Sequence, residues 1–161
     1  SGKNKYALTS SKEDAFNVFL FAAENSNAEW GLRGLRRDGE DFYMLRTSLS
    51  PEYINKFTFD FKTSEITFDI HSHPGLGKES QQASGFSKTG YLGDMLTIQE
   101  RYENLQKIGR KYPDEFPPHY IYHKSSQNLY QYTPFQPSIF LSKIASAKML
   151  RETVKTLKKT K

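Results

Sequence analysis

Residues 66–73 carry the pattern that most restricts what this chain can fold into. Apolar and polar side chains alternate through this stretch and Pro74 ends it, which predicts a β-strand with one face toward the core. The apolar face would hold Ile66, Phe68 and Ile70. The opposite face would carry Thr67, Asp69, His71 and His73. Two imidazoles on one face of a strand end are suited to binding one metal ion.

The remaining periodicity predicts helices and strands spread along the chain. A capping box, Ser10 with Glu13 or Ser11 with Asp14, opens a helix that extends to about Ala23. The other expected elements are strands at 29–36 and 41–46 joined by a turn at Asp38-Gly39, a strand at 57–61, a helix at about 94–109, a hairpin of 119–124 with 129–133, and a final helix from about 138 to the basic end. This order predicts an α+β fold in three layers, with a mixed β-sheet flanked by helices.

Length and composition restrict the class of protein. The 161 residues are expected to form a single domain, and Ser1-Gly2 resembles the scar of a cleaved tag, so we expect a fragment of a larger protein. Aromatic residues make up 14% of the chain, which favours a packed globular fold. The longest apolar run, residues 18–23, is too short for a membrane helix, so a soluble chain with no membrane segment is expected. The absence of cysteine excludes thiol catalysis and cysteine-ligated zinc.

The net charge of +5 is concentrated in the C-terminal tail. The basic residues there are Lys143, Lys148, Arg151, Lys155, Lys158, Lys159 and Lys161, opposed only by Glu152. Such a tail is either a solvated helix face or a surface that attracts nucleic acid or an acidic partner. No aromatic side chain follows Ala145 on which bases could stack, so nucleic acid is not an expected partner.

A catalytic zinc site needs a third protein ligand besides the two histidines. Asp94 is the candidate, because it begins the predicted helix directly after the Gly- and Ser-rich loop 74–93; the alternative is a plain helix N-cap. Asp69 is expected to accept a hydrogen bond from an imidazole N–H. His119 and His123 are interpreted as ordinary residues of a half-exposed strand.

Hydrolysis at a zinc site also needs a general base. Glu29 is the candidate, because it begins the predicted strand that follows the first helix after a short loop. Its competitors in the sequence are Glu24, Glu40 and Glu65.

Together these residues resemble the JAMM (JAB/MPN-like) zinc metalloproteases. The features shared are a Glu in a Gly-containing strand after the first helix, His-x-His-Pro at a strand end, and an Asp at the start of the next helix, in an order that matches from about Ser10 to Thr133. The resemblance implies a three-layer, cytidine-deaminase-like fold, one Zn²⁺ ion, and hydrolysis of peptide or isopeptide bonds, often in ubiquitin-like proteins. It implies His71, His73 and Asp94 as zinc ligands and Glu29 as the acid–base residue.

Within that family the sequence is similar to the divergent JAB-like domains at the C-termini of bacterial polymorphic toxins. This likeness implies a secreted toxin or effector domain. Its implied partners are a protein substrate and an immunity protein.

Two features depart from the family pattern. Twenty residues separate His73 from Asp94, which is longer than usual, and Tyr91 stands where the family has an oxyanion-stabilising serine. The Tyr91 phenol can donate the same hydrogen bond. Other donors in the loop are Ser84, Ser87 and Thr89. The five glycines of the loop predict a mobile cover over the metal.

The sequence therefore leaves three functions open. The first is a zinc-dependent peptidase or isopeptidase. The second is a non-catalytic JAMM-like protein-binding module, which would result if the oxyanion donor is lost. The third, a metal-dependent nuclease toxin, rests only on the positive charge and the His-x-His pair.

Overall fold

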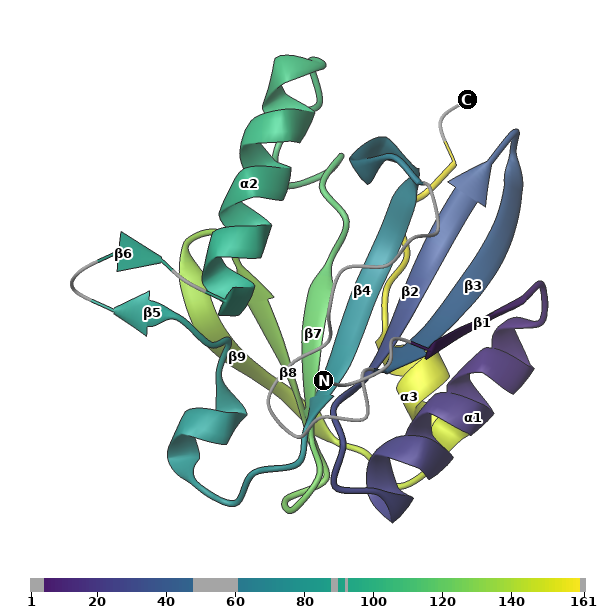
Figure 1. The fold of residues 1–161 in the computed structure, drawn as a ribbon. Coiled ribbons are helices and arrows are strands. Elements are labelled where there is room, and N and C mark those ends of the chain that lie inside the picture. The colour runs from purple at the N-terminus through teal and green to yellow at the C-terminus, as the bar shows by residue number, and fades with distance from the viewer. Residues whose placement is uncertain (1–4, 48–60, 88–89, 92, 160–161) are drawn as a thin grey trace.

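A seven-stranded mixed β-sheet forms the centre of the described part of the chain (Figure 1). The structure is a computed structural model that describes residues 5–47, 61–87, 90–91 and 93–159, the side chains of 86, 87, 90 and 91 excepted. The strands of the sheet are β1 (Lys5–Thr9), β2 (Trp30–Arg37), β3 (Glu40–Thr47), β4 (Ile66–His73), β7 (His119–His123), β8 (Asn128–Thr133) and β9 (Gln136–Lys143). Their order is β1-β3-β2-β4-β7-β8-β9, and within this sheet only β4 and β7 pair in parallel.

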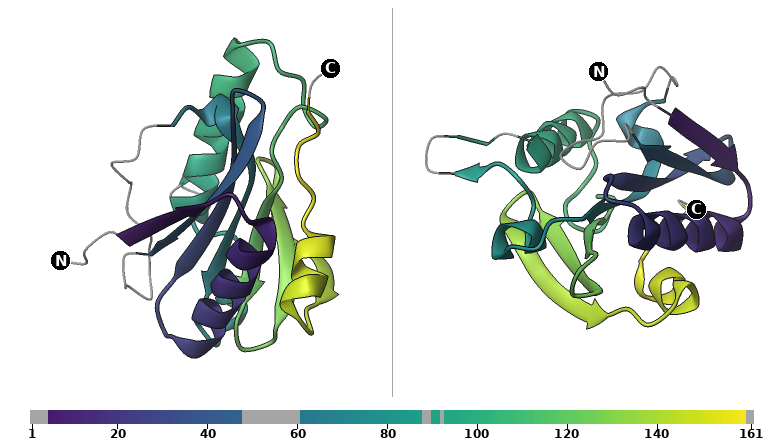
Figure 2. Two further views of the ribbon diagram at one scale, coloured as in Figure 1. Left: turned by 90° about the vertical axis from the view of Figure 1, so that its right-hand side faces the viewer. Right: turned by 60° about the horizontal axis from the view of Figure 1, so that its bottom comes forward.

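Helices cover both faces of this sheet and give the three layers that the sequence predicts (Figures 1 and 2). The helices are α1 (Lys12–Asn25), α2 (Gly93–Lys107) and α3 (Ala147–Thr153), and the short elements are η1 (Thr63–Glu65), η2 (Lys78–Gln81), β5 (Phe86–Ser87) and β6 (Gly90–Tyr91). α1 and α3 pack on one face, where the ring of Phe16 stacks on Phe68. α2 packs on the other face, where Ile98 lies against Ile121. Because both faces are covered, every residue of β4 is buried.

Local signals in the sequence account for most of the N-terminal half. Ser11 caps α1 by accepting a hydrogen bond from the Asp14 N–H, so Ser11 rather than Ser10 is the N-cap, but the Ser11 N–H donates to the Thr9 hydroxyl and not to Asp14, so no capping box forms. Asp38 and Gly39 form the β2–β3 turn with φ angles of 53° and 79°, as an Asp-Gly pair favours. β1 is a strand that the sequence analysis does not predict, because it is exposed along its length and shows no alternation of burial. Of the strand predicted at 57–61, residues 57–60 lie outside the described residues.

The alternation of β4 is interrupted near its start. Gly34 of β2 pairs with Phe68, but the next residue, Leu35, pairs with Ile66, so Thr67 is an extra residue in β4. Phe68 and Ile70 face α1 as predicted, but Ile66 packs with Leu35 in a separate cluster on the other face. The prediction that Ile66 shares their face is wrong, because the one-residue bulge at Thr67 moves the side chain before it to the opposite face of the sheet.

The C-terminal region differs most from the prediction. Residues 136–143 form β9, an edge strand, and the predicted long helix is reduced to the seven residues of α3. The Thr133 hydroxyl accepts hydrogen bonds from the backbone N–H groups of Phe135 and Gln136, which reverses the chain after β8 and returns it as a strand. Ser146 then caps α3 through the Met149 N–H.

The chain beyond α3 is partly anchored. Ile144, Leu150 and Val154 are buried in the core under α1, whereas Phe140 is 58% exposed. The Leu157 N–H donates to the Thr67 carbonyl. The lysines at 155, 158 and 159 are exposed, as predicted. None of the described helices has the length and apolar character needed to span a membrane.

Truncation at two points should separate the anchored part of this segment from the solvated part. We predict that deleting residues 159–161 changes the melting temperature by less than about 2 °C, because chain ends contribute few contacts. Deleting residues 154–161 should lower it by about 5–10 °C, because burying Val154 is worth about 1.5–3 kcal/mol and the backbone hydrogen bonds of Val154, Lys155 and Leu157 are lost with it. Circular dichroism melts test both, and equal melting temperatures for the two truncations would contradict the assignment.

Candidate metal centre

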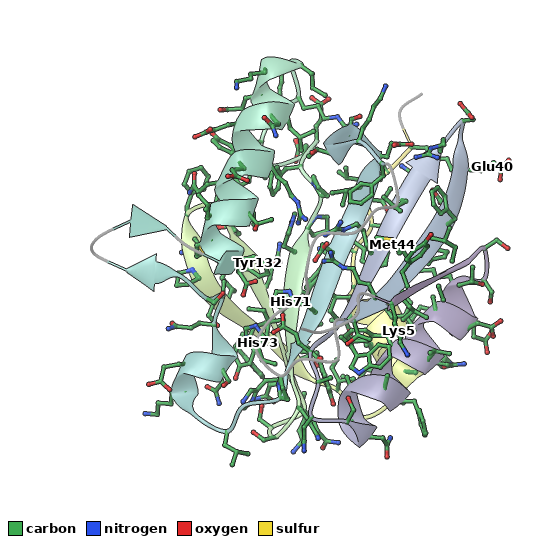
Figure 3. All side chains as sticks on the ribbon, viewed as in Figure 1. Lys5, Glu40, Met44, His71, His73 and Tyr132 are labelled. Atoms are coloured by element: carbon green, nitrogen blue, oxygen red, sulfur yellow. The ribbon has the colours of Figure 1, made fainter. Side chains whose placement is uncertain are left out.

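Four side chains that the sequence analysis singles out converge at the C-terminal end of β4. Glu29, His71, His73 and Asp94 each offer one ligand atom, and these atoms all lie within 4.8 Å of one another. Figure 3 shows His71 and His73 at this end of the strand, with Tyr132 of β8 beside them. The pair comes from β4, Asp94 from the first turn of α2, and Glu29 from the residue before β2.

Strand pairing brings Glu29 to the histidines. Gly31 lies opposite His71 in the β2–β4 ladder, so Glu29 continues past the paired residues toward the metal-binding end. Ser72, between the two histidines, accepts the Trp30 N–H through its hydroxyl at 2.9 Å. The Thr47 hydroxyl donates to the Glu29 carbonyl at 2.8 Å. The peptide group that joins Glu29 to Trp30 is therefore held through both its N–H and its carbonyl by neighbouring strands.

The donor atoms have the spacing of a metal-ligand set. Nε2 of His71 lies 3.0 Å from Nε2 of His73 and 3.1 Å from Oδ2 of Asp94, and the third separation is 3.4 Å. Two ligands bonded at about 2.0–2.1 Å to one tetrahedral zinc ion are about 3.3–3.4 Å apart, so the residues fit such an ion. Glu29 is farther away, with Oε1 3.9 Å from Nε2 of His71. It lies beside the three-residue ligand set rather than within it.

Neighbouring groups orient the two imidazoles. Nδ1 of His73 lies 2.9 Å from the Ser80 carbonyl oxygen, which can only accept a hydrogen bond. The proton of a neutral His73 is therefore on Nδ1, and Nε2 keeps its lone pair for a metal. The ring of His71 packs edge-on against Tyr132 at 5.8 Å between centroids. Neither the contact of His73 with Ser80 nor that of His71 with Tyr132 has a signal in the sequence.

Ser84 makes two hydrogen bonds with Asp94 and one with the next residue, Met95. Its N–H donates to Oδ2 of Asp94 at 2.9 Å, its hydroxyl oxygen accepts the Asp94 N–H at 3.0 Å, and its carbonyl accepts the Met95 N–H at 3.0 Å. Burial opposes ionisation of Asp94, but His71 and His73 outweigh it and hold the pKa of Asp94 well below its usual value. Asp94 is thus an ionised carboxylate aimed at the histidines as well as a helix-start residue.

Gly93 permits this close approach. It has a φ angle of +54°, and a Cβ atom there would lie 2.4 Å from the Ser84 hydroxyl oxygen. Between Ser84 and Gly93, β5 and β6 pair in an antiparallel hairpin. The hairpin lengthens the chain between His73 and Asp94, while Ser84 lies next to Asp94 in space.

Burial dominates the electrostatics of Glu29. Loss of solvation raises the pKa of Glu29 to about 8; the positive charge of a protonated His73 and of Arg46 acts in the opposite direction, and Asp94 adds to the rise. A carboxyl group that titrates near neutrality is suited to both accepting and donating a proton.

The competing bases lie elsewhere. Glu24 accepts a hydrogen bond from the Tyr122 hydroxyl on the α1 face, Glu65 pairs with Arg37, and Glu40 is exposed at the β2–β3 turn. The prediction for Tyr91 stays untested, because its side chain lies outside the described residues, as do Thr89 and the Ser87 side chain. Ser84, an alternative donor in the sequence analysis, is the loop hydroxyl that the structure places beside a ligand.

Asp69 has a different partner from the one expected. It accepts a hydrogen bond from Nε of Arg33 at 2.6 Å, and Arg46 and Arg101 also lie within 4 Å of it. The expectation that Asp69 binds a metal-ligating imidazole is therefore wrong. Burial raises the pKa of this carboxyl, but the three guanidinium groups outweigh burial and bring it below the usual value.

His119 and His123 are fully buried rather than half-exposed. Arg101 donates to Nε2 of His119 at 2.7 Å, so this imidazole is neutral, and burial together with Arg101 lowers its pKa to about 3. Nε2 of His123 lies 2.9 Å from the Gly75 carbonyl and so helps to position the loop after His73. Neither belongs to the metal group.

The loop after β4 is fastened to the sheet edge. The Ala83 N–H donates to the Pro137 carbonyl, and the Ser138 hydroxyl donates to the Gln81 carbonyl, so η2 and the residues after it are tied to β9. This part of the predicted cover contacts His73 through the Ser80 carbonyl and Asp94 through the Ser84 N–H.

A mixed sheet between helical layers, with two strand-end histidines and a helix-start aspartate in a group that could hold a metal ion, is the arrangement of a JAB-like domain. The family model for JAB-like toxin 1 matches residues 7–99, and the chain belongs to this family. The match includes all four residues of the metal group. No curated protein and no solved structure matches the chain.

The geometry predicts one metal ion per chain. We expect protein purified without chelator to contain about one equivalent of zinc, and His71→Ala to lose it, because removing one of three ligands leaves an incomplete set. His123→Ala is the matched control, since it removes a buried imidazole that lies outside the metal group. Elemental analysis measures both. Equal zinc content in the two variants would contradict the ligand assignment.

Proposed function

We propose that this domain is a zinc-dependent hydrolase that cleaves peptide or isopeptide bonds. The single observation that carries the proposal is the position of Glu29, a buried carboxyl group beside a three-residue ligand set but outside it. A site that only stores a metal has no need for a fourth titratable group near neutrality. Membership of the JAB-like toxin 1 family supports a role as a toxin or effector domain.

His71, His73 and Asp94 would hold the zinc ion. Two imidazoles and one carboxylate, with no thiolate, are the donor set of open catalytic zinc sites. When bound, zinc would supply Lewis-acid polarisation of the scissile carbonyl group and make water acidic enough to attack near neutral pH. All the other contributions come from the chain itself.

Glu29 would move the proton. As water adds to the carbonyl carbon, a C–O bond forms and Oε1 of Glu29 accepts a proton from the water. The same oxygen then delivers that proton to the nitrogen as the C–N bond breaks, so a carboxylic acid and an amine are released. A pKa of about 8, raised by burial, matches both directions of transfer at neutral pH.

Ser84 would stabilise the negative charge that develops on the carbonyl oxygen. Its hydroxyl oxygen already accepts the Asp94 N–H, which leaves the O–H group to donate, and the residue is exposed. A donor in place before the reaction needs no reorganisation when the charge appears. We therefore assign to Ser84 the role that the sequence pattern gives to Tyr91.

The proposed substrate is a protein, with ubiquitin-like conjugates as the class to test first, and the proposed cellular partner is an immunity protein. A panel of folded proteins, unfolded proteins and ubiquitin-like conjugates distinguishes a general peptidase from an isopeptidase. A zinc-loaded protein that cuts none of them would favour the non-catalytic binding module.

Replacing the base should abolish turnover and leave the metal in place. We predict that Glu29→Gln lowers kcat by roughly 10² to 10⁴, the usual contribution of general acid–base catalysis, because the amide keeps the shape but cannot take up the proton. Zinc content and melting temperature should stay close to those of the wild type, since Glu29 is outside the ligand set.

Glu24→Gln is the matched control for Glu29→Gln. Glu24 lies on the opposite face of the sheet, so its replacement should leave kcat unchanged. Full activity of Glu29→Gln would overturn the mechanism, and loss of zinc from it would place Glu29 among the ligands.

Two hydroxyl variants should distinguish the oxyanion donor. We predict that Ser84→Ala lowers kcat by about 10² to 10³ at nearly unchanged KM, as expected for loss of one oxyanion donor. The backbone bonds of residue 84 to Asp94 and Met95 remain, so zinc should be retained. Tyr91→Phe should have little effect on kcat. The reverse result would assign the donor to Tyr91.

A further inference from the structure

A second cleft lies at the other end of β4 from the metal centre. It has a volume of about 550 Å³ and opens between the loop 110–118 and the C-terminal segment 155–158. Figure 2 shows this segment rising beside the connection from α2 to β7. Thr67 lines the cleft and His73 belongs to the metal group; six residues of strand, roughly 20 Å, separate them. The two sites are therefore distinct.

Hydrogen bonds between distant parts of the chain fix the walls of this cleft. The Leu157 N–H donates to the Thr67 carbonyl, and the Lys155 N–H donates to the Tyr120 hydroxyl. Nη2 of Arg36 donates to the Leu157 carbonyl at 3.0 Å. A cleft of this size with fixed walls has the dimensions of a small-molecule site.

Basic groups predominate in the lining. Arg36, Arg110, Lys155 and Lys158 line the cleft together with Asp114 and Glu115. Arg36 is paired with Asp41, but Lys155 and Lys158 form no ion pair with any residue in the described ranges. These lysines sit on an exposed segment, with their charges available to a ligand.

Two further donors in the same walls are unsatisfied. Nη1 of Arg110 and the hydroxyl of Thr156 are shielded from solvent and have no hydrogen-bond partner among the described residues, although Nη2 of Arg110 donates to the Ser64 carbonyl at 2.7 Å. Buried donors without acceptors cost free energy, so a ligand with several acceptor oxygens would be favoured here.

Aromatic rings also line the cleft. Tyr112 and Phe116 lie on the same loop as Arg110, Asp114 and Glu115, and their rings meet edge-to-face with centroids 5.5 Å apart. Such a surface favours contact with an apolar or planar group. The cleft therefore combines cationic donors with aromatic area.

We propose that this cleft is a binding site for a small phosphate monoester that carries a planar ring. A phosphate group has the charge and the number of oxygens to engage two lysines, Arg110 and Thr156 together, which a carboxylate lacks. The ring would lie against Tyr112 and Phe116.

Titration of the isotope-labelled full chain with phenyl phosphate, followed by NMR, tests the proposal. Saturable shifts are expected at the backbone amides of residues 110–112, 114–116 and 155–157 and not at residues 71–73 or 94. Inorganic phosphate lacks the ring and benzoate lacks the phosphate group, so each should bind more weakly than phenyl phosphate. Shifts confined to the metal centre, or equal binding of benzoate, would overturn the proposal.

Charge-matched variants separate a built site from general attraction. Lys155→Ala/Lys158→Ala should weaken binding of phenyl phosphate at least about tenfold, because both charge-assisted bonds to the phosphate are removed. Lys143→Ala/Lys148→Ala removes the same charge from exposed positions outside the cleft and should stay within about twofold of the wild type. Thr156→Val, which removes only a hydroxyl, should also weaken binding. Equal losses in the two double variants would show nonspecific electrostatic attraction and refute the site.

Discussion

The antiparallel pairing of β2 with β4 determines where Glu29 lies relative to the two histidines of the metal centre. With Gly31 opposite His71, the residue two positions before Gly31 reaches the strand end that carries both histidines. The buried ion pair of Arg33 with Asp69, 2.6 Å long, joins the same two strands one layer further along. A register shifted by one residue would place Glu29 on the α1 face, where it has no role. The strand register therefore sets the position of Glu29 beside the histidines.

The metal centre holds two carboxyl groups in a buried place. Asp94 adds to the rise in the pKa of Glu29, and burial removes the water that would solvate either carboxylate. A divalent cation offsets this cost directly, so binding of the metal and stability of the fold are coupled. The arginines around Asp69 contribute positive charge one layer away, and Arg46 acts on both Asp69 and Glu29. Charge is thus arranged in adjacent layers of opposite sign along one face of the sheet.

Sequence patterns predicted the features that depend on local chemistry. The alternation of residues 68–73, the helix start at Asp94 and the Asp38-Gly39 turn each have a short-range cause, and the described residues bear them out. What could not be predicted depends on partners far away in the sequence. The side on which Ile66 packs follows from a bulge opposite Gly34, and β9 replaces the expected helix because β8 offers an edge to pair with. The contact of Ser84 with Asp94 was hidden by the hairpin inserted between them.

Fastening the loop after β4 to β9 has an entropic consequence for metal binding. Four hydrogen bonds from residues 80–84 reach either a ligand side chain or the edge strand, so this segment is ordered by folding itself. An ion that binds here would meet side chains and backbone that have already lost their conformational freedom, so little further entropy would be lost on binding. Its removal by a chelator would be slow, because His73 and Asp94 are held in place by hydrogen bonds to residues outside the metal group.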